Sequence, residues 1–312
     1  MIARRIQYYH YGGPETMRLE AFDPPALRSG EVMVRVAFAA INPIDWKVRE
    51  GKLKMMTGRS FPRGFGSDLS GTVIAVGPGV TRFAVGDDVF GCVRLKDSGA
   101  IGSIAMAPET FLARKPDAIS LEEAACLGTP AVTAWNALVD KAEIEAGDRV
   151  FINGATGAVG ASAVQIAHML GAGASGTSSA QERDRACRMG IDPVYDYRTT
   201  DLNSLRERFG IVYDTVGNMT AATAFRLLEP TGIFLDNHPT PIKFIRALLN
   251  RRYKPIVCTV RAEIMDALAA AADSGQLLLP VVEIAPLPEA IALITAMERG
   301  RRLSGKAIVS MS

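Results

Sequence analysis

Cysteine and histidine are scarce in this chain of 312 residues, and neither is grouped as a metal site requires. The four cysteines, Cys92, Cys126, Cys187 and Cys258, form no CxxC pair, which argues against a structural zinc lobe and against a disulfide framework. We expect most of them to be small core residues. The three histidines lie at no metal-ligand spacing from one another or from a cysteine. The sequence therefore predicts no metal site.

Long apolar runs and an excess of one charge are also missing. Lys and Arg number 35 and Asp and Glu number 33, so the formal charge is +2 and no strong field for nucleic acid or an anionic membrane is expected. Apolar stretches such as IMDALAAAA are interrupted before they reach the length of a membrane span, and the N-terminal MIARRIQYYHYGG lacks the apolar block of a signal peptide. We expect a cytoplasmic protein with a small-molecule partner, and neither nucleic acid nor a membrane as partner.

The chain contains two kinds of pattern in succession. From Glu31 to about Pro116, Gly, Pro and Asp clusters separate short β-rich runs, as in a β-barrel or sandwich: VMVRVAFAAI, GTVIAVG, DDVFGCV and TFLARKP. After position 121, helical patterns such as LEEAACLGTPAVTAWNALVDKA alternate with apolar strands at VFIN, GASGTS, PVYDY, GIVYDTVG, GIFLD and PIVCTV. This alternation predicts a doubly wound parallel sheet. The segment from about Arg261, with strands LLLPVVEIA and GKAIVSM, is expected to return to the first domain.

The stretch FINGATGAVG (151–160) places three glycines between an apolar strand and a helical pattern. Such glycines let backbone N–H groups approach a pyrophosphate at the positive end of a helix. The spacing differs from the common G-x-G-x-x-G, so close helix–strand packing is the alternative interpretation, but the following βα units favour dinucleotide binding. The predicted contacts are Gly154, Ala155, Thr156, Gly157, Ala158, Val159 and Gly160.

The choice of dinucleotide depends on the end of the second strand, where an acidic side chain would bind the ribose 2′-hydroxyl of NAD. This chain has Ser178 and Ser179 there, and Arg183 or Arg185 could pair with a 2′-phosphate, so NADP (NADPH) is the predicted cofactor. Two alternatives stay open at this point. Glu182 could turn inward to the ribose, or the serine pair could only cap the next helix.

Taken in order, these motifs resemble the medium-chain dehydrogenase/reductase superfamily, and within it the zinc-independent quinone oxidoreductase branch. The likeness covers nearly the whole chain and depends on INPIDWKVREG (41–51), GSDLSGTV (66–73), GPGVTRFAVGDDVFG (77–91), TAWNAL (133–138), the glycine turn, DYR (196–198), YDTVG (213–217) and GKAIV (305–309). The resemblance implies an α/β protein with a GroES-like β-barrel catalytic domain at 1–121, completed by 262–312, and a Rossmann NADP-binding domain at 122–261. It also implies nicotinamide at the interdomain cleft and a homodimer.

Zinc-containing members of the superfamily carry a Cys near the NP motif, a GHE run and a four-Cys lobe, whereas this chain has NPID, GSD and no lobe. The resemblance therefore implies a zinc-free reductase that transfers hydride from NADPH to a quinone or an α,β-unsaturated carbonyl, with the cofactor carrying the chemistry. An NADPH-binding sensor or interaction protein with little turnover is the alternative, because fold alone does not fix function. A zinc alcohol dehydrogenase with unorthodox ligands is a more distant one.

The resemblance also implies individual roles. Asn42 would lie beside the nicotinamide, and Asp45 is a catalytic candidate whose alternative role is an Asx-type turn. Trp46 is expected in the core. The predicted cofactor contacts outside the glycine turn and the serine pair are Thr133, Arg183, Tyr197, Val216, Gly217, Asn237 and His238. For His238 the alternative is capping of the turn at 239–241.

One departure from the family concerns the proton donor. Many relatives have a tyrosine two residues after the glycine of the REG stretch, but here Gly51 is followed by Lys52 and Leu53. Its absence favours an acceptor that can take its proton from solvent, such as a quinone. Met55 and Met56 follow, as an adaptable apolar pocket, ordinary core or a lid. The basic stretch IKFIRALLNRRYK (242–254) could be a dimer rim, a lid or a solvated face, and the last is expected.

Overall fold

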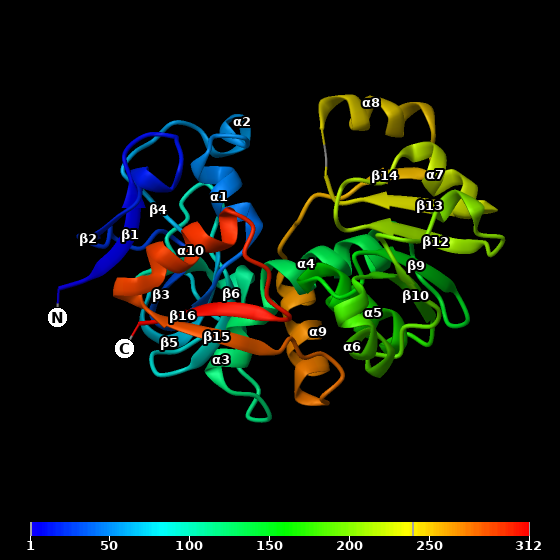
Figure 1. Ribbon diagram of the computed structural model, residues 1–312. Helices are drawn as coiled ribbons and strands as arrows, with labels where there is room; N and C mark the ends of the chain where they lie inside the picture. Colours follow the sequence, from blue (N-terminus) through cyan, green and yellow to red (C-terminus); the bar gives the residue numbers. More distant parts are fainter. Residues whose placement is uncertain (1, 239, 312) are drawn as a thin grey trace. The chain divides into compact units, whose positions relative to one another are not determined.

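The computed structural model describes residues 2–238 and 240–311, which form two compact units (Figure 1). Unit 1 comprises the chain up to Thr129 together with the chain from Val260 onward, and unit 2 comprises Pro130–Thr259. Within the described ranges, no helix is both long enough and apolar enough to cross a bilayer.

Unit 1 is built on two sheets. Within the described residues, the smaller has the strand order β2-β1-β4 and the larger has the order β15-β16-β3-β5-β6-β8, with β7 also pairing to β3. Adjacent strands are antiparallel except β15 and β16, which are parallel. The strands are β1 (Arg4–Tyr8), β2 (Arg18–Ala21), β3 (Glu31–Ala40), β4 (Arg63–Gly64), β5 (Asp68–Val76), β6 (Asp88–Cys92), β7 (Ile104–Pro108), β8 (Leu112–Arg114), β15 (Val281–Pro286) and β16 (Lys306–Ser310).

The C-terminal segment completes the larger sheet of unit 1, because β16 pairs with β3 through Ile308 and Ala40. Helix α9 packs against β8, and α10 packs against β15. Side chains from β3, β5, β16 and α10, among them Val34, Leu69 and Ile294, meet in one apolar core. The helices of this unit are α1 (Pro43–Arg49), α2 (Lys54–Thr57), α3 (Leu121–Ala124), α9 (Ala262–Asp273) and α10 (Ala290–Glu298).

Unit 2 contains a sheet whose adjacent strands are all parallel, in the order β11-β10-β9-β12-β13-β14. The chain order along it is third, second, first, fourth, fifth, sixth, which confirms the predicted doubly wound sheet. The strands are β9 (Arg149–Asn153), β10 (Gly173–Ser178), β11 (Val194–Asp196), β12 (Phe209–Asp214), β13 (Leu228–Asp236) and β14 (Tyr253–Pro255). The α-helices are α4 (Thr129–Trp135), α5 (Ala158–Met169), α6 (Arg183–Arg188), α7 (Ala221–Leu227) and α8 (Pro241–Leu249), and α4 begins at the last residue of unit 1.

One expectation about local structure is confirmed only in part, and two are wrong. The helical pattern at 121–142 is broken at Gly128, where a Cβ would lie 2.7 Å from the Asp68 carboxyl, and it ends in a π-helix at Asn136–Lys141. The strand expected at PIVCTV lies earlier, at β14, because Tyr253 pairs with Phe234. Half rather than most of the cysteines are in the core, because Cys187 and Cys258 are exposed.

Candidate functional site

The glycine turn lies where β9 gives way to α5, at the carboxyl edge of the parallel sheet. Gly154 has a φ of +80°, and a Cβ there would lie 2.5 Å from Val216 Cγ2. A Cβ on Gly160 would lie 2.2 Å from the Gly154 carbonyl oxygen. These two glycines are therefore required by backbone conformation and close packing.

Gly157 differs from its two neighbours in the motif. It is the N-cap of α5, it supplies no side-chain cap, and its φ of −69° is open to any residue. A Cβ added there would meet only the Gly154 carbonyl oxygen, at 3.4 Å. Packing thus does not explain this glycine. The amides at the start of a helix lack intrahelical acceptors, and the helix dipole favours an anion beside them, so the turn fits a dinucleotide pyrophosphate.

A polar frame formed by Asn153, Thr177, Asp214 and Asn218 holds the turn in place. Asn153 Nδ2 donates to Asp214 Oδ1 and to Asn218 Oδ1, both at 2.8 Å, while Thr177 Oγ1 donates to Asn153 Oδ1 at 2.8 Å. The Gly154 amide donates to Thr177 Oγ1 at 2.8 Å. This frame joins the ends of β9, β10 and β12 at the point where the strand order reverses, which is where open α/β sheets bind ligands.

The same frame fixes the loop after β12. The Asp214 carboxylate accepts hydrogen bonds from the amides of Val216, Gly217 and Met219 at 3.1, 2.9 and 2.8 Å. Gly217 has a φ of +86°, and a Cβ on it would lie 2.2 Å from His238 Nδ1. The structure thus brings the predicted Val216, Gly217 and His238 together beside the glycine turn.

The loop after β13 also contributes to this edge. The Asn237 amide donates to the Asp214 carbonyl at 3.1 Å, and the His238 amide donates to Asp236 Oδ1 at 2.9 Å. Both predicted residues therefore border the β12 loop. The alternative prediction for His238 was capping of the turn at 239–241. That turn contains position 239, which lies outside the described residues.

The ends of β10 and β11 gather the residues predicted to choose between the two dinucleotides. The Tyr197 amide donates to the Ser178 carbonyl at 3.2 Å, and the Arg198 guanidinium lies 5.5 Å from the centre of the exposed Tyr197 ring. Arg183 is exposed and donates one N–H to the Val194 carbonyl at 3.1 Å. Arg198 is a second cation at this edge that the sequence interpretation did not single out.

Glu182 and Ser179 make contacts that concern the two alternatives at this edge. Glu182 pairs with Arg185 at 3.0 Å. Ser179 precedes the 3₁₀ turn Ala180–Glu182 without a side-chain cap, and Ser178 Oγ donates to the Ser179 carbonyl. Capping by Ser179 is therefore wrong as an explanation of the serine pair.

Unit 1 contains a second polar cluster, here called the Asp68 network, formed by Asn42, Asp45, Ser67, Asp68, Cys92, Thr129 and Lys306. Lys306 Nζ donates to the Ile41 carbonyl at 2.9 Å and to Asn42 Oδ1 at 2.6 Å. Asn42 Nδ2 in turn donates to Asp68 Oδ2 at 2.8 Å. The side-chain amide of Asn42 is therefore held between a carboxylate and an ammonium.

Thr129 closes the network on the other side of Asp68. Its amide donates to Asp68 Oδ2 at 2.8 Å, and its hydroxyl donates to Asp68 Oδ1 at 2.5 Å. This contact explains the broken helix at Gly128. An amide that donates to a side-chain carboxylate is taken out of the helical hydrogen-bond pattern, and the Thr129 amide donates to Asp68. Thr133, the predicted cofactor contact, is buried one turn further along α4.

Asp45 makes a capping-box bond at the start of α1, which differs from the Asx-type turn of its alternative role, and one further contact. Its Oδ2 accepts the amide of Asn42 at 2.8 Å, which stabilises the start of α1. Its Oδ1 accepts a hydrogen bond from Ser67 Oγ at 2.8 Å, and Ser67 Oγ lies 3.5 Å from Thr129 Oγ1. The two hydroxyls, each donating to one of the carboxyl groups, thus lie between Asp45 and Asp68.

Burial raises the pKa of both carboxyl groups in this network. The pKa of Asp45 rises from 3.8 to about 7, first because of burial and then because of the nearby Asp68 charge. Burial also raises the pKa of Asp68, whereas Lys306 and the bonds from Thr129 and Asn42 act in the opposite direction. Asp68 accepts more hydrogen bonds than Asp45, so we assign the negative charge to Asp68 and the higher proton affinity to Asp45.

The segment that lacks the family tyrosine lies in α1–α2. Leu53 precedes α2, and Met55 and Met56 are 93% and 63% exposed, which makes ordinary core the wrong interpretation for them. A different tyrosine, Tyr11, lies against Gly51, where a Cβ would be 2.9 Å from its ring. Its hydroxyl donates to the Gly58 carbonyl. Trp46 packs partly buried against the apolar core, as expected.

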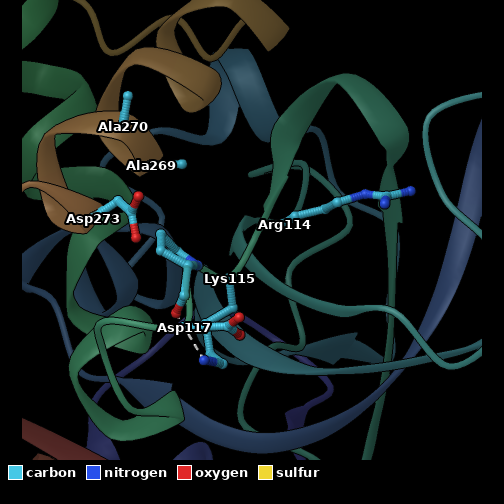
Figure 2. A pocket seen from close by; sticks show the side chains of 7 residues that line it. Arg114, Lys115, Asp117, Ala269, Ala270 and Asp273 are labelled. Atoms are coloured by element: carbon cyan, nitrogen blue, oxygen red, sulfur yellow. Dashed lines mark hydrogen bonds between the residues drawn. The ribbon is translucent and has the colours of Figure 1, made fainter.

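A surface cavity of about 400 Å³ elsewhere in unit 1 is lined by Arg114, Lys115, Asp117, Asp273 and α9 alanines (Figure 2). Lys115 Nζ donates to the carbonyls of Pro116 and Ile119, both at 2.8 Å, and Arg114 pairs with Asp87 at 2.9 Å. The cavity shares no residue with the Asp68 network. Because its cations are already engaged, we assign no chemistry to it.

Sequence reasoning missed the roles of Asp68, Lys306, Asn153 and Asp214. For Asp214 the sequence did contain an indication of a functional role. It is an acidic residue at the end of an apolar strand, just before a loop that contains a glycine. The partners of Asp68 lie in three distant segments, so no local pattern indicated them. Across the described part of the chain, no group of three or more His, Cys, Asp or Glu side chains is placed to hold a metal ion.

Two family descriptions match this chain. Residues 28–117 match the family "Alcohol dehydrogenase GroES-like domain", and residues 189–309 match the family "Zinc-binding dehydrogenase". Together the two matches span segments of both units.

Individual proteins are similar along much of the chain. The chloroplastic quinone-oxidoreductase homolog of Spinacia oleracea is 33% identical over 246 residues, covering 76% of this chain and 75% of that protein. The chloroplastic NADPH-dependent alkenal/one oxidoreductase of Arabidopsis thaliana is 31% identical over 219 residues, covering 67% and 56%. The structure of the quinone oxidoreductase from Coxiella burnetii superposes with a TM-score of 0.90 at 25% identity, covering 100% of both chains.

Proposed function

Because this chain belongs to the medium-chain dehydrogenase/reductase superfamily, in its quinone oxidoreductase-like branch, we propose that it is an NADPH-dependent reductase of quinones or α,β-unsaturated carbonyls. Enzymes of this superfamily are oxidoreductases that use NAD(P)H on small molecules. The observation that carries the proposal is Gly157, a glycine that neither packing nor backbone conformation requires, at the bare head of α5.

In this proposal the residues of unit 2 bind and orient the dinucleotide. The amides at the start of α5 receive its pyrophosphate, and the Asn153–Asp214 bond holds the two adjacent loops at a fixed separation. Ser178, Tyr197 and Arg198 receive the 2′-phosphate. The pairing of Glu182 with Arg185 supports NADPH here, because Glu182 is the acid that the sequence offered for the ribose. The bound dinucleotide supplies hydride from its nicotinamide ring.

The Asp68 network holds the proton that the reduced product needs. Reduction of a quinone or an enone consumes one hydride and one proton, and the pKa of Asp45, raised to about 7, lets this carboxyl group exchange a proton near neutral pH. Ser67 bonds to Asp45, and Thr129, whose hydroxyl lies 3.5 Å from that of Ser67, is the partly exposed end of the network. Asn42, fixed between Asp68 and Lys306, acts as a positioning residue rather than as an acid.

The class of acceptor follows from the charge of the network. The positive charge nearest to Asn42 is the Lys306 ammonium, which is buried and already donates to two oxygens. Two of its three N–H donors are engaged and the side chain is buried, so it is poorly placed to polarise a substrate carbonyl. The acceptor must therefore be electrophilic on its own, as quinones and conjugated carbonyls are.

The test is the loss of NADPH absorbance when the purified protein is mixed with quinones, enals, enones and simple ketones, repeated with NADH. We expect turnover with one of the conjugated classes, none with simple ketones, and a preference for NADPH. Tight NADPH binding without oxidation by any acceptor would instead support a sensor with little turnover. Turnover of simple alcohols or ketones together with bound zinc would overturn the proposal.

A further inference from the structure

Strands β9, β12 and β13 end side by side in polar residues. Asn153 pairs in register with Asp214, and Asp214 pairs with Asp236, so the three lie in a row across the carboxyl edge of the sheet. Asp214 is 0% and Asp236 is 1% exposed. A buried carboxylate is costly unless donors compensate its charge, so each of these two acids must gather donors around it.

Asp236 differs from Asp214 because one of its partners is a cation. Asp214 accepts hydrogen bonds from neutral amide groups. The Asp236 carboxylate accepts the His238 amide at Oδ1 and the Tyr253 hydroxyl at Oδ2. Lys243 Nζ lies 2.7 Å from the same Oδ2, and the Lys243 side chain is only 20% exposed. Solvent therefore screens this ion pair less than it screens pairs on the open surface.

The ion pair closes the connection between β13 and α8. Asp236 is the last residue of β13, where pairing with β12 on one side and β14 on the other fixes its backbone. Lys243 lies in the first turn of α8. The pair thus ties the start of the helix to the end of the strand, and the connection between them carries Asn237 and His238.

The same connection is held against the loop after β12. The His238 amide donates to Asp236, and its ring lies so close to Gly217 that a Cβ there would be 2.2 Å from His238 Nδ1. The Asn237 amide donates to the Asp214 carbonyl at 3.1 Å. A displacement of Asp236 or of the first turn of α8 would therefore move Asn237 and His238 relative to the β12 loop.

The place of this connection in the sheet indicates which end of the dinucleotide it serves. A doubly wound sheet has two mononucleotide-binding halves, and the residues proposed for the 2′-phosphate lie at the ends of β10 and β11, in the first half. Strands β12 and β13 belong to the second half, which receives the nicotinamide mononucleotide. We propose that Lys243 and Asp236 are positioning residues for the nicotinamide end, an inference that rests on the proposed function. They hold Asn237 and His238 beside the carboxamide.

A cofactor fragment tests this role, because adenosine 2′,5′-bisphosphate contains the 2′-phosphate but no nicotinamide. In Lys243→Met the buried carboxylate loses its cation. We expect the Kd of NADPH to rise roughly tenfold, as for lost hydrogen bonds to a neutral carboxamide, while the Kd of the bisphosphate stays within about twofold. Lys243→Arg can form the same ion pair and should restore most of the NADPH affinity. Isothermal titration calorimetry measures both constants.

Two further variants separate positioning from stability. Arg246→Met removes an exposed cation from the next turn of the same helix and should leave both Kd values unchanged. Asp236→Asn with Lys243→Met leaves no unpaired charge, so its thermal midpoint should exceed that of Lys243→Met. Its NADPH affinity should stay low, because the tie between β13 and α8 is still missing. This double variant carries the test if Lys243→Met does not fold.

Three results would overturn the inference. They are an unchanged NADPH affinity in Lys243→Met, equal losses for NADPH and the bisphosphate, and full recovery of NADPH affinity in the double variant. In each case the ion pair would serve the fold alone. Failure of the proposed function looks different, because the wild type would then bind NADPH without oxidising it, and the Kd values would still decide the positioning role. A wild type that binds neither compound would refute both.

Discussion

The first prediction compares two glycines of one turn, Gly157 and Gly160, after the same change to alanine. In Gly157→Ala the new Cβ meets one atom at 3.4 Å and the backbone is already in an extended region. Losing glycine entropy in the unfolded chain stabilises by about 0.4–1 kcal/mol, while alanine is a poorer N-cap by a similar amount. The free energy of unfolding should therefore stay within about 1 kcal/mol of the wild type.

The effect of Gly157→Ala on NADPH should be larger. A methyl group at the head of α5 would hold a phosphate away from the amides that receive it. Losing one hydrogen bond to a charged group costs about 1.5–3 kcal/mol, which corresponds to roughly a 10- to 150-fold rise in Kd. Fluorescence titration with NADPH measures the Kd, and urea unfolding measures the stability.

Gly160→Ala is the matched control, because its Cβ would lie 2.2 Å from the Gly154 carbonyl oxygen and 2.9 Å from Ala155 Cα. Both atoms are backbone, so the turn must shift, at a cost of about 1–3 kcal/mol. The two variants should separate, one losing affinity with stability kept and the other losing stability. If Gly157→Ala keeps both its stability and its NADPH affinity, no phosphate approaches this turn, and the proposed cofactor site is wrong.

Three more predictions concern charges. Asp45 holds a proton up to about pH 7 in the folded protein but only to about pH 4 when unfolded, so its contribution to stability is complete below pH 4 and declines by roughly 4 kcal/mol as the pH rises to 7. Asp45→Asn should flatten that decline in urea unfolding at several pH values, and an unchanged slope would contradict the assigned proton. Lys306→Met leaves Asp68 without its cation and should destabilise by about 3–5 kcal/mol, whereas a stable variant would show that the ammonium is not needed. Arg198→Ala should raise the KM for NADPH roughly tenfold and leave that for NADH unchanged, and equal changes for both would argue against a 2′-phosphate contact.

Features written within one short segment were predictable from the sequence. The glycine turn was found because a strand, its turn and its helix are consecutive, and the alternation of strands with helices predicted the parallel sheet. The last strand of that sheet was predicted too late in the sequence, because PIVCTV has the apolar composition of a strand. The pairing of Tyr253 with Phe234 depends on Asp236, which accepts the Tyr253 hydroxyl and anchors Lys243. No periodicity contains that information.

The Asp68 network could not be predicted for a related reason. Its donors come from the end of β3, from the start of α4 and from β16, and each looks ordinary in its own segment. Asn42 was identified, but its role depends on Asp68 and Lys306, which hold its amide from both sides. The break at Gly128 has the same origin, because a continuous helix would withdraw the Thr129 amide from Asp68.

The Asp68 network contains hydrogen-bonding residues at positions where zinc-containing relatives have metal ligands. This difference bears on which acceptors the protein can reduce. Where zinc-containing relatives carry Cys and His, this chain carries Asn42 and Ser67, and both bond to carboxylates that also need compensation. A metal ion attracts a substrate oxygen through open coordination positions. The Lys306 ammonium, by contrast, donates to Ile41 and Asn42, while the Asp68 carboxylate receives donors from Asn42 and Thr129. Such a network can hold a proton and orient an amide, but it offers little positive charge to a developing alkoxide. Conjugated acceptors spread that negative charge over their own atoms, so they are the substrates that this network suits.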